Sequence, residues 1–561
     1  MVRKSIYYFS IFISIISFLF IFLSQLKNGL VLGGDTPFHI SRIFEIRMAF
    51  INHSFPSWVN FTSFYNLGQA INGMYPDVTL WPFVLITMWL PFSKQIVVIT
   101  ALIFILTFIV TFYSLVKHNF DKSMAITTAM VYSFSGYCIY QFIIEFQPGT
   151  GIIYAFSFPI FFYMKELFVK QSADFKTIIK GTLLFSLILF SHLLSAVVFL
   201  LIFFISFILN LTIQKRINYY AIYNVLVSSF LTFIVCLPVI YRLIKIRMSG
   251  ITEPFGKGNV TAESFNKLFS NLQVISRVSL SAVSLFLLII ILIYSNKTAL
   301  INELLSIELF IMILCTNIIP WNIIGKIPLL NMLQYTPWRF GIWLSILPLF
   351  IFIRMDSNID VNSKVLVLSI VCILSVANVI GNYKNYMNSP LKFTSNNVTS
   401  LNQIKYNPIH NRILIRDYSP KQANKVGIND KVSKRVINQA KSPYIKADKS
   451  KIKVKKQIEA NGVKLRMHGF SEKRKILLPV YGYRSLKKEY SITLNDKYEV
   501  SEKNITTEDG FLKLNIPNGY YNSLKINSIK ISFNNPKIYS ILIVLSTFLL
   551  SILVVLYFAF D

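Results

Sequence analysis

The sequence predicts a polytopic α-helical membrane protein that carries one β-rich domain outside the bilayer. The 561 residues are 54% hydrophobic and only 14% charged, whereas soluble proteins contain about 25% charged residues. The apolar residues gather in runs of roughly 15 to 22, which is long enough to span hydrocarbon. Between 381 and 537 a lysine-rich stretch replaces these runs, and parts of it alternate apolar with polar residues as strands do.

About twelve apolar runs are predicted to cross the membrane. The first follows Arg3 and Lys4, and no small-residue cleavage site comes after it, so we expect a retained span and a cytoplasmic N-terminus. Residues 78–92 form a shorter run broken by two prolines, which predicts a juxtamembrane or re-entrant helix at the outer face. The predicted spans are 6–23, 96–116, 124–144, 151–164, 178–190, 193–211, 221–241, 280–294, 307–319, 340–353, 365–380 and 538–558.

Loop charges set the predicted orientation. Counting from a cytoplasmic N-terminus, every short loop that falls in the cytoplasm carries lysine or arginine, as the positive-inside rule expects. The result is a transmembrane domain at 1–381 with a large first outer loop at 27–95, an extracytoplasmic domain at 382–537 and a C-terminal transmembrane helix at 538–561. The basic domain does not contradict the rule, because long segments translocate largely regardless of charge.

The exported domain is strongly basic. It holds roughly half of the 56 lysine and arginine residues, and the whole chain has a net charge of +31. Alternation at 490–494 and 525–533 predicts strands, and we expect a small β-sandwich. The charge favours an anionic partner, either lipid headgroups of the bilayer or an envelope polymer, and the alternative is a solvated face that reflects composition alone. No nucleic-acid-binding module is recognisable, so nucleic acid is not an expected partner.

The cysteines predict neither a disulfide framework nor a zinc site. Each stands singly inside an apolar run, which favours four small buried side chains. They are Cys138, Cys236, Cys315 and Cys372.

The most distinctive polar residues follow the first span. Asp35, His39 and Arg42 are spaced i, i+4 and i+7, so they share one stripe of a helix that Thr36 and Pro37 would begin. A carboxylate, an imidazole and a guanidinium on one face could hold an acceptor hydroxyl and a phosphate. The alternative is that Asp35 serves only as the N-cap of this helix.

Three further ionisable residues fall at the outer ends of predicted spans. Asp77 ends a turn, Glu145 closes a span and His192 interrupts a very apolar stretch. An ionisable residue at such a depth is a functional candidate. The alternatives are a turn aspartate that faces water, an ordinary interfacial carboxylate and a histidine that only breaks a helix.

A last cluster opens the span at 340–353 from the outside. It contains Gln334, Trp338 and Arg339. Guanidinium binds phosphate through paired hydrogen bonds, and here it would sit at headgroup depth. The alternative is a tryptophan–arginine membrane anchor.

Together these segments resemble a bacterial membrane-protein family labelled "6-pyruvoyl-tetrahydropterin synthase-related", close to the YfhO-like proteins, whose members look like GT-C glycosyltransferases. The resemblance implies inverting transfer of a sugar from a polyprenyl-phosphate donor to an envelope glycan or glycolipid acceptor on the outer face. It makes Asp35 the general base and Arg339 the group that binds the lipid phosphate. The assisting residues would be His39, Arg42 or His192. The matching segments are GDTPFHISRI at 34–43, NGMYPD at 72–77, Glu145, HLLS at 192–195, QYTPWRF at 334–340 and DYSP at 417–420, with the terminal strand domain and its closing span.

The resemblance leaves some roles open. Glu145 lacks the basic residue that the family pattern places shortly before it. Asp77 would bind a sugar hydroxyl or, together with Asp35, a divalent metal, although two separated carboxylates are a weak metal signal and no cofactor is assigned. Two other function classes compete: a lipid or polysaccharide transporter or flippase, and a non-catalytic envelope protein that binds polymer. Transporters place ionisable residues near the midplane, so the clustering at outer ends favours the glycosyltransferase.

Overall fold

Six long apolar helices dominate the structure, a computed structural model. It describes residues 2–31, 35–214, 217–252, 260–269, 281–296, 298–327, 330–356, 359–388, 392–393, 416–424, 434–442, 444–447, 450–459, 461–470, 475–516 and 525–559. Within these residues, six helices are long and apolar enough to cross a membrane, and two bent helix pairs raise the number to at most eight. The six are α1 (Val2–Asn28), α5 (Phe92–Lys117), α11 (Leu193–Gln214), α17 (Thr336–Arg354), α18 (Val361–Met387) and α20 (Lys537–Ala559).

The other predicted spans are bent or short helices. The axes of α8 (Pro148–Ala155) and α9 (Ser157–Val169) meet at 49°, and those of α12 (Tyr219–Val235) and α13 (Leu237–Arg247) at 66°. The run at 124–144 is not one helix, because it divides into α6 (Lys122–Ser133), α7 (Gly136–Ile139) and a π-helix, η3 (Tyr140–Ile144). The remaining helices of this part are α10 (Phe175–Ser191), α14 (Ala282–Tyr294), α15 (Ala299–Leu314), α16 (Trp321–Ile324) and the 3-10 turns η4 (Phe265–Leu268) and η5 (Leu330–Leu333). Several apolar helices are compatible with a membrane protein, and the number of about twelve crossings stays a prediction.

The first outer loop is largely helical. Its main helix, α2 (Thr36–Ile51), begins where the sequence predicted, with a proline in the first turn whose fixed φ suits that position. The predicted helix at 78–92 is shorter than expected, because only η2 (Val78–Leu80) and α4 (Trp81–Thr87) form before α5 begins. Between α2 and η2 lie η1 (Phe64–Asn66) and α3 (Ile71–Met74).

The C-terminal domain is one antiparallel sheet of nine strands in the order β8-β7-β11-β5-β4-β3-β6-β10-β9. The strands are β3 (Tyr444–Ala447), β4 (Ser450–Glu459), β5 (Gly462–Phe470), β6 (Lys475–Tyr481), β7 (Tyr490–Leu494), β8 (Tyr498–Glu499), β9 (Ile505–Glu508), β10 (Phe511–Asn515) and β11 (Ile526–Phe533). The predicted sandwich does not form, because β3 pairs with β4 on one side and with β6 on the other, which joins both halves into one curled half-barrel. Helix α19 (Lys434–Lys441) and the turns η7 (Lys421–Asn424), η8 (Arg484–Glu489) and η9 (Glu502–Asn504) complete the domain.

The half-barrel and the first outer loop share one hydrophobic core. Trp58, Phe61 and Leu67 of the loop are buried in the same cluster as Leu465 and Ile492 of the sheet. A short sheet also pairs β1 (Leu30–Val31), directly after α1, with β2 (Lys392–Phe393). The boundary predicted at 381/382 therefore divides the chain in sequence, whereas in space the outer loop and the C-terminal domain form one body.

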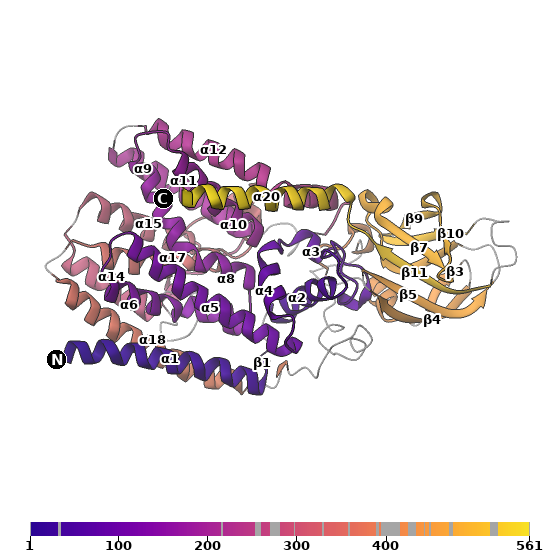
Figure 1. Cartoon of the computed structure of the whole chain (residues 1–561), viewed down its shortest axis with the longest axis horizontal. Coiled ribbons are helices and arrows are strands. Elements are labelled where there is room, and N and C mark those ends of the chain that lie inside the picture. Colours follow the sequence, from indigo (N-terminus) through magenta and orange to yellow (C-terminus); the bar gives the residue numbers. More distant parts are fainter. Residues whose placement is uncertain are drawn as a thin grey trace.

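Figure 1 shows the half-barrel at one end of the long axis and both chain termini at the other, with α2, α3 and α4 between the sheet and the long helices. Contacts join the loops at the terminal end: Arg3 lies 3.9 Å from Asp360, and the Lys117 ammonium donates to the Tyr557 hydroxyl over 3.1 Å. These loops are among those predicted to be cytoplasmic, so the structure brings them to one end of the molecule.

Candidate functional site

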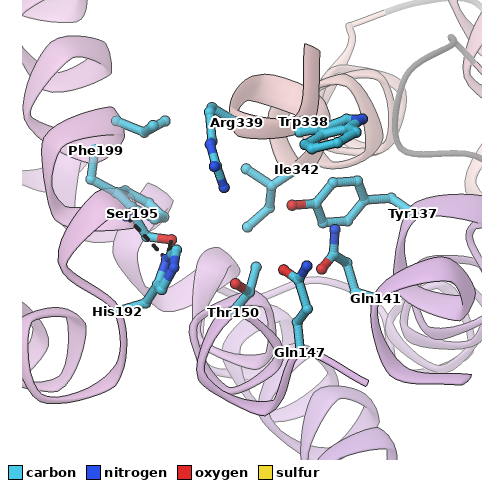
Figure 2. A pocket seen from close by; sticks show the side chains of 11 residues that line it. Tyr137, Gln141, Gln147, Thr150, His192, Ser195, Phe199, Trp338, Arg339 and Ile342 are labelled. Atoms are coloured by element: carbon cyan, nitrogen blue, oxygen red, sulfur yellow. Dashed lines mark hydrogen bonds between the residues drawn. The ribbon is translucent and has the colours of Figure 1, made fainter. Parts of the chain in front are cut away.

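A pocket lies beside the first turns of α8, α11 and α17, between these helices and α7 and η3. The pocket is small and partly open to solvent. Figure 2 shows the Arg339 guanidinium extending into it from α17, with His192 and Ser195 on one side and Gln147 and Thr150 facing them from α8 and the residue before it. The described residues that line it are Tyr137, Gln141, Gln147, Thr150, His192, Ser195, Val198, Phe199, Trp338, Arg339 and Ile342.

Arg339 is held by the turn that precedes its helix. Its Nε donates to the Leu333 carbonyl over 3.1 Å, and its Nη2 donates to Gln334 Oε1 over 2.6 Å. Gln334 has a left-handed backbone with φ of 61°, a conformation uncommon for residues other than glycine. Trp338 lies on the pocket wall, its ring 4.8 Å from that of Tyr335. Trp338 and Arg339 thus line the pocket, and Gln334 contacts Arg339 from the turn before α17.

Asp35 is more than the N-cap of α2. It occupies the cap position, but its side chain makes no capping hydrogen bond and is exposed. Instead its Oδ2 accepts a hydrogen bond of 3.2 Å from Gln147 Nε2. The same nitrogen donates to Glu145 Oε2 over 3.0 Å, and Tyr140 donates to Glu145 Oε1 over 2.8 Å. One amide thus bridges two carboxylates, which lie within about two hydrogen-bond lengths of each other.

Glu145 follows a strained stretch of backbone. It is buried directly after the π-helix η3, and the next residue, Phe146, has φ of 43°. Thr36 at the start of α2 donates to the Ile144 carbonyl over 3.1 Å, which fixes α2 against the end of η3. Interruptions of this kind are frequent at functional sites, and here they direct Glu145 toward Gln147.

His192 lies between α10 and α11, where the sequence predicted a break in the helix. Its side chain is buried and uncharged. Its Nδ1 accepts from the backbone N–H of Ser195 over 3.3 Å, which assigns the ring proton to Nε2, 3.0 Å from the Tyr75 hydroxyl. Burial, then the positive charges of Arg339 and Arg42, lower the pKa of His192 to about 3. At neutral pH it is a hydrogen-bonding group and not a cation.

Arg42 and His39 lie one layer behind the pocket. The Arg42 guanidinium donates to the Pro76 carbonyl over 2.7 Å, lies 3.2 Å from His39 Nδ1 and sits 4.3 Å from the centroid of the Tyr75 ring. Arg42 is 1% exposed and burial lowers its pKa. Neither residue lines the pocket, so their geometry favours positioning of Tyr75, and through it His192, over direct contact with a phosphate.

Asp77 is locked into a buried ion pair. Its Oδ1 accepts from Arg242 over 2.7 Å and its Oδ2 accepts from the Trp81 ring over 2.9 Å. Arg242 also donates to the Tyr539 hydroxyl over 3.2 Å, and both members of the ion pair are 1% exposed. Asp77 therefore stabilises the loop, and it is not among the residues that line the pocket.

A segment of the C-terminal domain approaches the same layer. Tyr418 has φ of 59°, its N–H donates to the Thr252 carbonyl over 2.8 Å, and its carbonyl accepts from the Tyr483 hydroxyl over 2.8 Å. Burial raises the pKa of the Tyr418 phenol, and the nearby charges of Arg42 and Arg339 oppose that shift. The DYSP motif thus lies beside the candidate site.

The described ranges contain no group of three or more His, Cys, Asp or Glu side chains that could hold a metal ion. Of the two aspartates predicted to share a metal, Asp35 lies near Glu145, whereas Asp77 is engaged elsewhere. A divalent metal therefore stays a prediction.

The sequence did not point to three residues that hydrogen-bond the predicted site residues: Gln147, Tyr75 and Arg242. Gln147 lies two residues after Glu145, Tyr75 lies inside the NGMYPD segment, and Arg242 directly follows the predicted span at 221–241. An amide or a phenol carries little signal by itself, since its role depends on partners that are distant in sequence. No family model, curated protein or solved structure matches this chain.

Proposed function

We propose that this protein is a GT-C-type membrane glycosyltransferase that moves a sugar from a polyprenyl-phosphate donor to an envelope acceptor. One observation carries the proposal: Gln147 lines the pocket that contains Arg339, and its amide holds the exposed carboxylate of Asp35. A base at the edge of a pocket and a guanidinium inside it are the two groups that inverting transfer from a lipid phosphate needs.

In the proposed reaction, Asp35 takes the proton of an acceptor hydroxyl as its oxygen attacks the anomeric carbon of the sugar. The bond from that carbon to the phosphate oxygen breaks, and the electron pair leaves with the polyprenyl phosphate, so the configuration inverts. Arg339 stabilises the negative charge that develops on the departing phosphate. His192, being uncharged, orients groups by hydrogen bonding, and Glu145 fixes the Gln147 amide that aims Asp35.

The charge of the lining supports the choice of an anionic leaving group. Among the eleven residues around the pocket, Arg339 alone carries a fixed charge, and Tyr137, Phe199, Trp338 and Ile342 supply apolar surface. A phosphate attached to an isoprenoid chain combines these two properties. The apolar helices around the pocket would let the chain remain in the bilayer while the phosphate reaches the guanidinium.

The decisive test is a lipid-linked-sugar transfer assay on purified protein, comparing wild type with Asp35→Asn. The substitution keeps the shape of the side chain but cannot accept the proton, so turnover should fall about 100- to 10,000-fold. Asp356→Asn is the matched control, because Asp356 is exposed after α17, at the far end of that helix from Arg339. A folded Asp35→Asn protein that transfers sugar at the wild-type rate would contradict the proposal.

That outcome would favour transport as the function. Both carboxylate oxygens of Glu308 on α15 are buried without a hydrogen-bond partner among the described residues, and such groups often mark ion or proton paths. Lys180, the other ionisable residue inside a predicted span, is instead paired with Glu166 at 2.6 Å.

The proposed orientation puts the pocket and the half-barrel outside and both termini in the cytoplasm, with about twelve crossings. Support comes from the gathering of basic loops at the terminal end. Single cysteines at the exposed positions Asp35 and Lys488 should react in intact cells with an impermeant thiol reagent. A cysteine at Asp356 should react only after permeabilisation, and the four native cysteines are buried. Labelling of Lys488→Cys only after lysis would invert the orientation.

A further inference from the structure

The outward face of the half-barrel carries a row of cations that form no ion pair with any described residue. Strands β3, β4 and β5 direct Ile445, Val454 and Leu465 into the core, so the alternate residues face outward. The outward positions with exposed basic side chains, here called the cation row, are Lys446, Lys451, Lys453, Lys455 and Arg466.

The register of the strands places like charges directly opposite each other. Lys446 on β3 is opposite Lys451 on β4, and Lys455 on β4 is opposite Arg466 on β5. Directly opposed side chains have Cβ atoms about 4.5 to 5.5 Å apart, and like charges there destabilise a sheet. Because stability alone disfavours such pairs, their presence points to a function on this face.

Within the described part of the sheet, the ion pairs lie outside the row. Lys464 pairs with Asp496 and Lys530 pairs with Glu459, whereas none of the five cations of the row forms an ion pair there. The charge is therefore neutralised at the flank and uncompensated in the middle. A solvated basic surface that reflected composition alone would have no reason for this division.

We propose that the cation row binds an extended anionic polymer of the cell envelope. Successive outward residues on one strand are about 7 Å apart and neighbouring strands about 4.8 Å apart, so the row offers a band of positive charge to a chain with repeating negative groups. A bilayer surface is the less suitable partner. Figure 1 shows β3, β4 and β5 at the end of the molecule opposite the termini, with the α2–α4 layer between the sheet and the long helices.

Such a surface would act independently of the pocket. It would concentrate polymer at the outer end of the molecule, and binding should weaken with salt because bound counterions are released when cations and a polyanion associate. This inference does not rest on the proposed glycosyltransferase activity, and it would hold for a protein without catalysis.

The test uses the full chain in nanodiscs of zwitterionic lipid, with fluorescently labelled inorganic polyphosphate and poly-glutamate as probes. The triple variant Lys446→Gln, Lys451→Gln, Lys455→Gln should bind either probe at least about tenfold more weakly and with a shallower salt dependence. Its thermal stability should be equal to or above that of wild type, because two like-charge pairs are relieved.

The matched control removes the same charge elsewhere on the domain. Lys488→Gln, Lys497→Gln, Lys503→Gln changes three exposed lysines outside the row, and its affinity should stay close to wild type. Equal losses in both triple variants would overturn the proposal, since binding would then depend on the total charge of the domain and not on the cation row. Binding of wild type to anionic vesicles but to neither polymer would overturn it in favour of a lipid surface. Should the first triple fail to fold, Lys453→Glu alone, which places an acid in the middle of the row, should give the same weakening.

Discussion

The two aspartates of the first outer loop show how differently one loop can use the same side chain. Asp35, at the start of the loop, is exposed and held by a single amide hydrogen bond of 3.2 Å. Asp77, near its end, is 1% exposed on its side chain and accepts from both Arg242 and Trp81. The first is open to a ligand, whereas the second is engaged in a buried ion pair.

The comparison teaches that burial and partners, more than residue type, separate a candidate base from a structural acid. Both residues belong to segments that resemble the family pattern, so the sequence placed them in one site. The structure leaves Asp35 open to a ligand and uses Asp77 to support the loop. Substitutions of the two aspartates, of Arg339 and of His192 test that division through their effects on stability and turnover.

Removing the negative charge of Asp77 should destabilise the protein. In Asp77→Asn the buried Arg242 keeps its charge but loses its counterion, and breaking a buried pair in this way typically costs about 3 to 5 kcal/mol. Thermal unfolding in detergent should show a clear loss for Asp77→Asn and almost none for Asp35→Asn. If Asp77→Asn were as stable as wild type and selectively inactive, Asp77 would belong to the active site.

A compensating double variant sharpens this result. Asp77→Leu with Arg242→Met removes both charges together, and apolar replacement of a buried pair is often neutral or stabilising. The double variant should therefore recover most of the stability that Asp77→Asn loses. Failure to recover would mean that the contacts of Arg242 with Tyr539 and Tyr75 matter more than the ion pair.

Arg339 should affect catalysis more than stability. Arg339→Ala removes the fixed charge found among the described residues of the pocket lining, and losing one such donor typically lowers turnover about 100- to 1,000-fold. Arg339→Lys keeps the charge but loses the planar fork, so its loss should be smaller. The same lipid-linked-sugar assay measures both, and equal losses in the two variants would assign the effect to the contacts with Gln334 and Leu333.

His192 should make the protein sensitive to acid. Its pKa is lowered to about 3 in the folded state, compared with about 6.5 when unfolded, so the unfolded state binds the proton first as the pH falls. The stability that His192 contributes is complete above pH 6.5 and is lost progressively toward pH 3. At pH 5 the loss is about 2 kcal/mol, and unfolding measured at pH 7.5 and 5 should show this difference in wild type but not in His192→Asn.

Local features of the fold could be predicted from the sequence, and long-range ones could not. The start of α2 follows from a proline in its first turn, and β7 and β11 follow from their alternation. The half-barrel could not be predicted, because its continuity depends on β3 pairing with both β4 and β6. The divided and bent helices could not be predicted either, because apolar content gives no sign of a break such as the one after Ser133.

The candidate site follows the same rule. Asp35 and Arg339 are charged residues in apolar surroundings, and this can be read from the sequence alone. Gln147, which connects them, is an uncharged side chain whose importance comes from a partner 112 positions away. Arg42 was predicted to meet a ligand because it shares a stripe with Asp35, but the structure turns it toward Tyr75 and the Pro76 carbonyl.

The shared core of the first outer loop and the half-barrel has a consequence for biosynthesis. Asn535 accepts from the Trp58 backbone N–H over 3.0 Å and donates to the Pro56 carbonyl over 2.9 Å, and Tyr539 meets Arg242. The loop leaves the ribosome long before its closing partner Asn535, which follows Trp58 by 477 positions. Its native contacts are therefore of high contact order and form only after residues 535–539 have been made. A chain that stops before these residues would leave the shared core of the loop and the half-barrel unfinished.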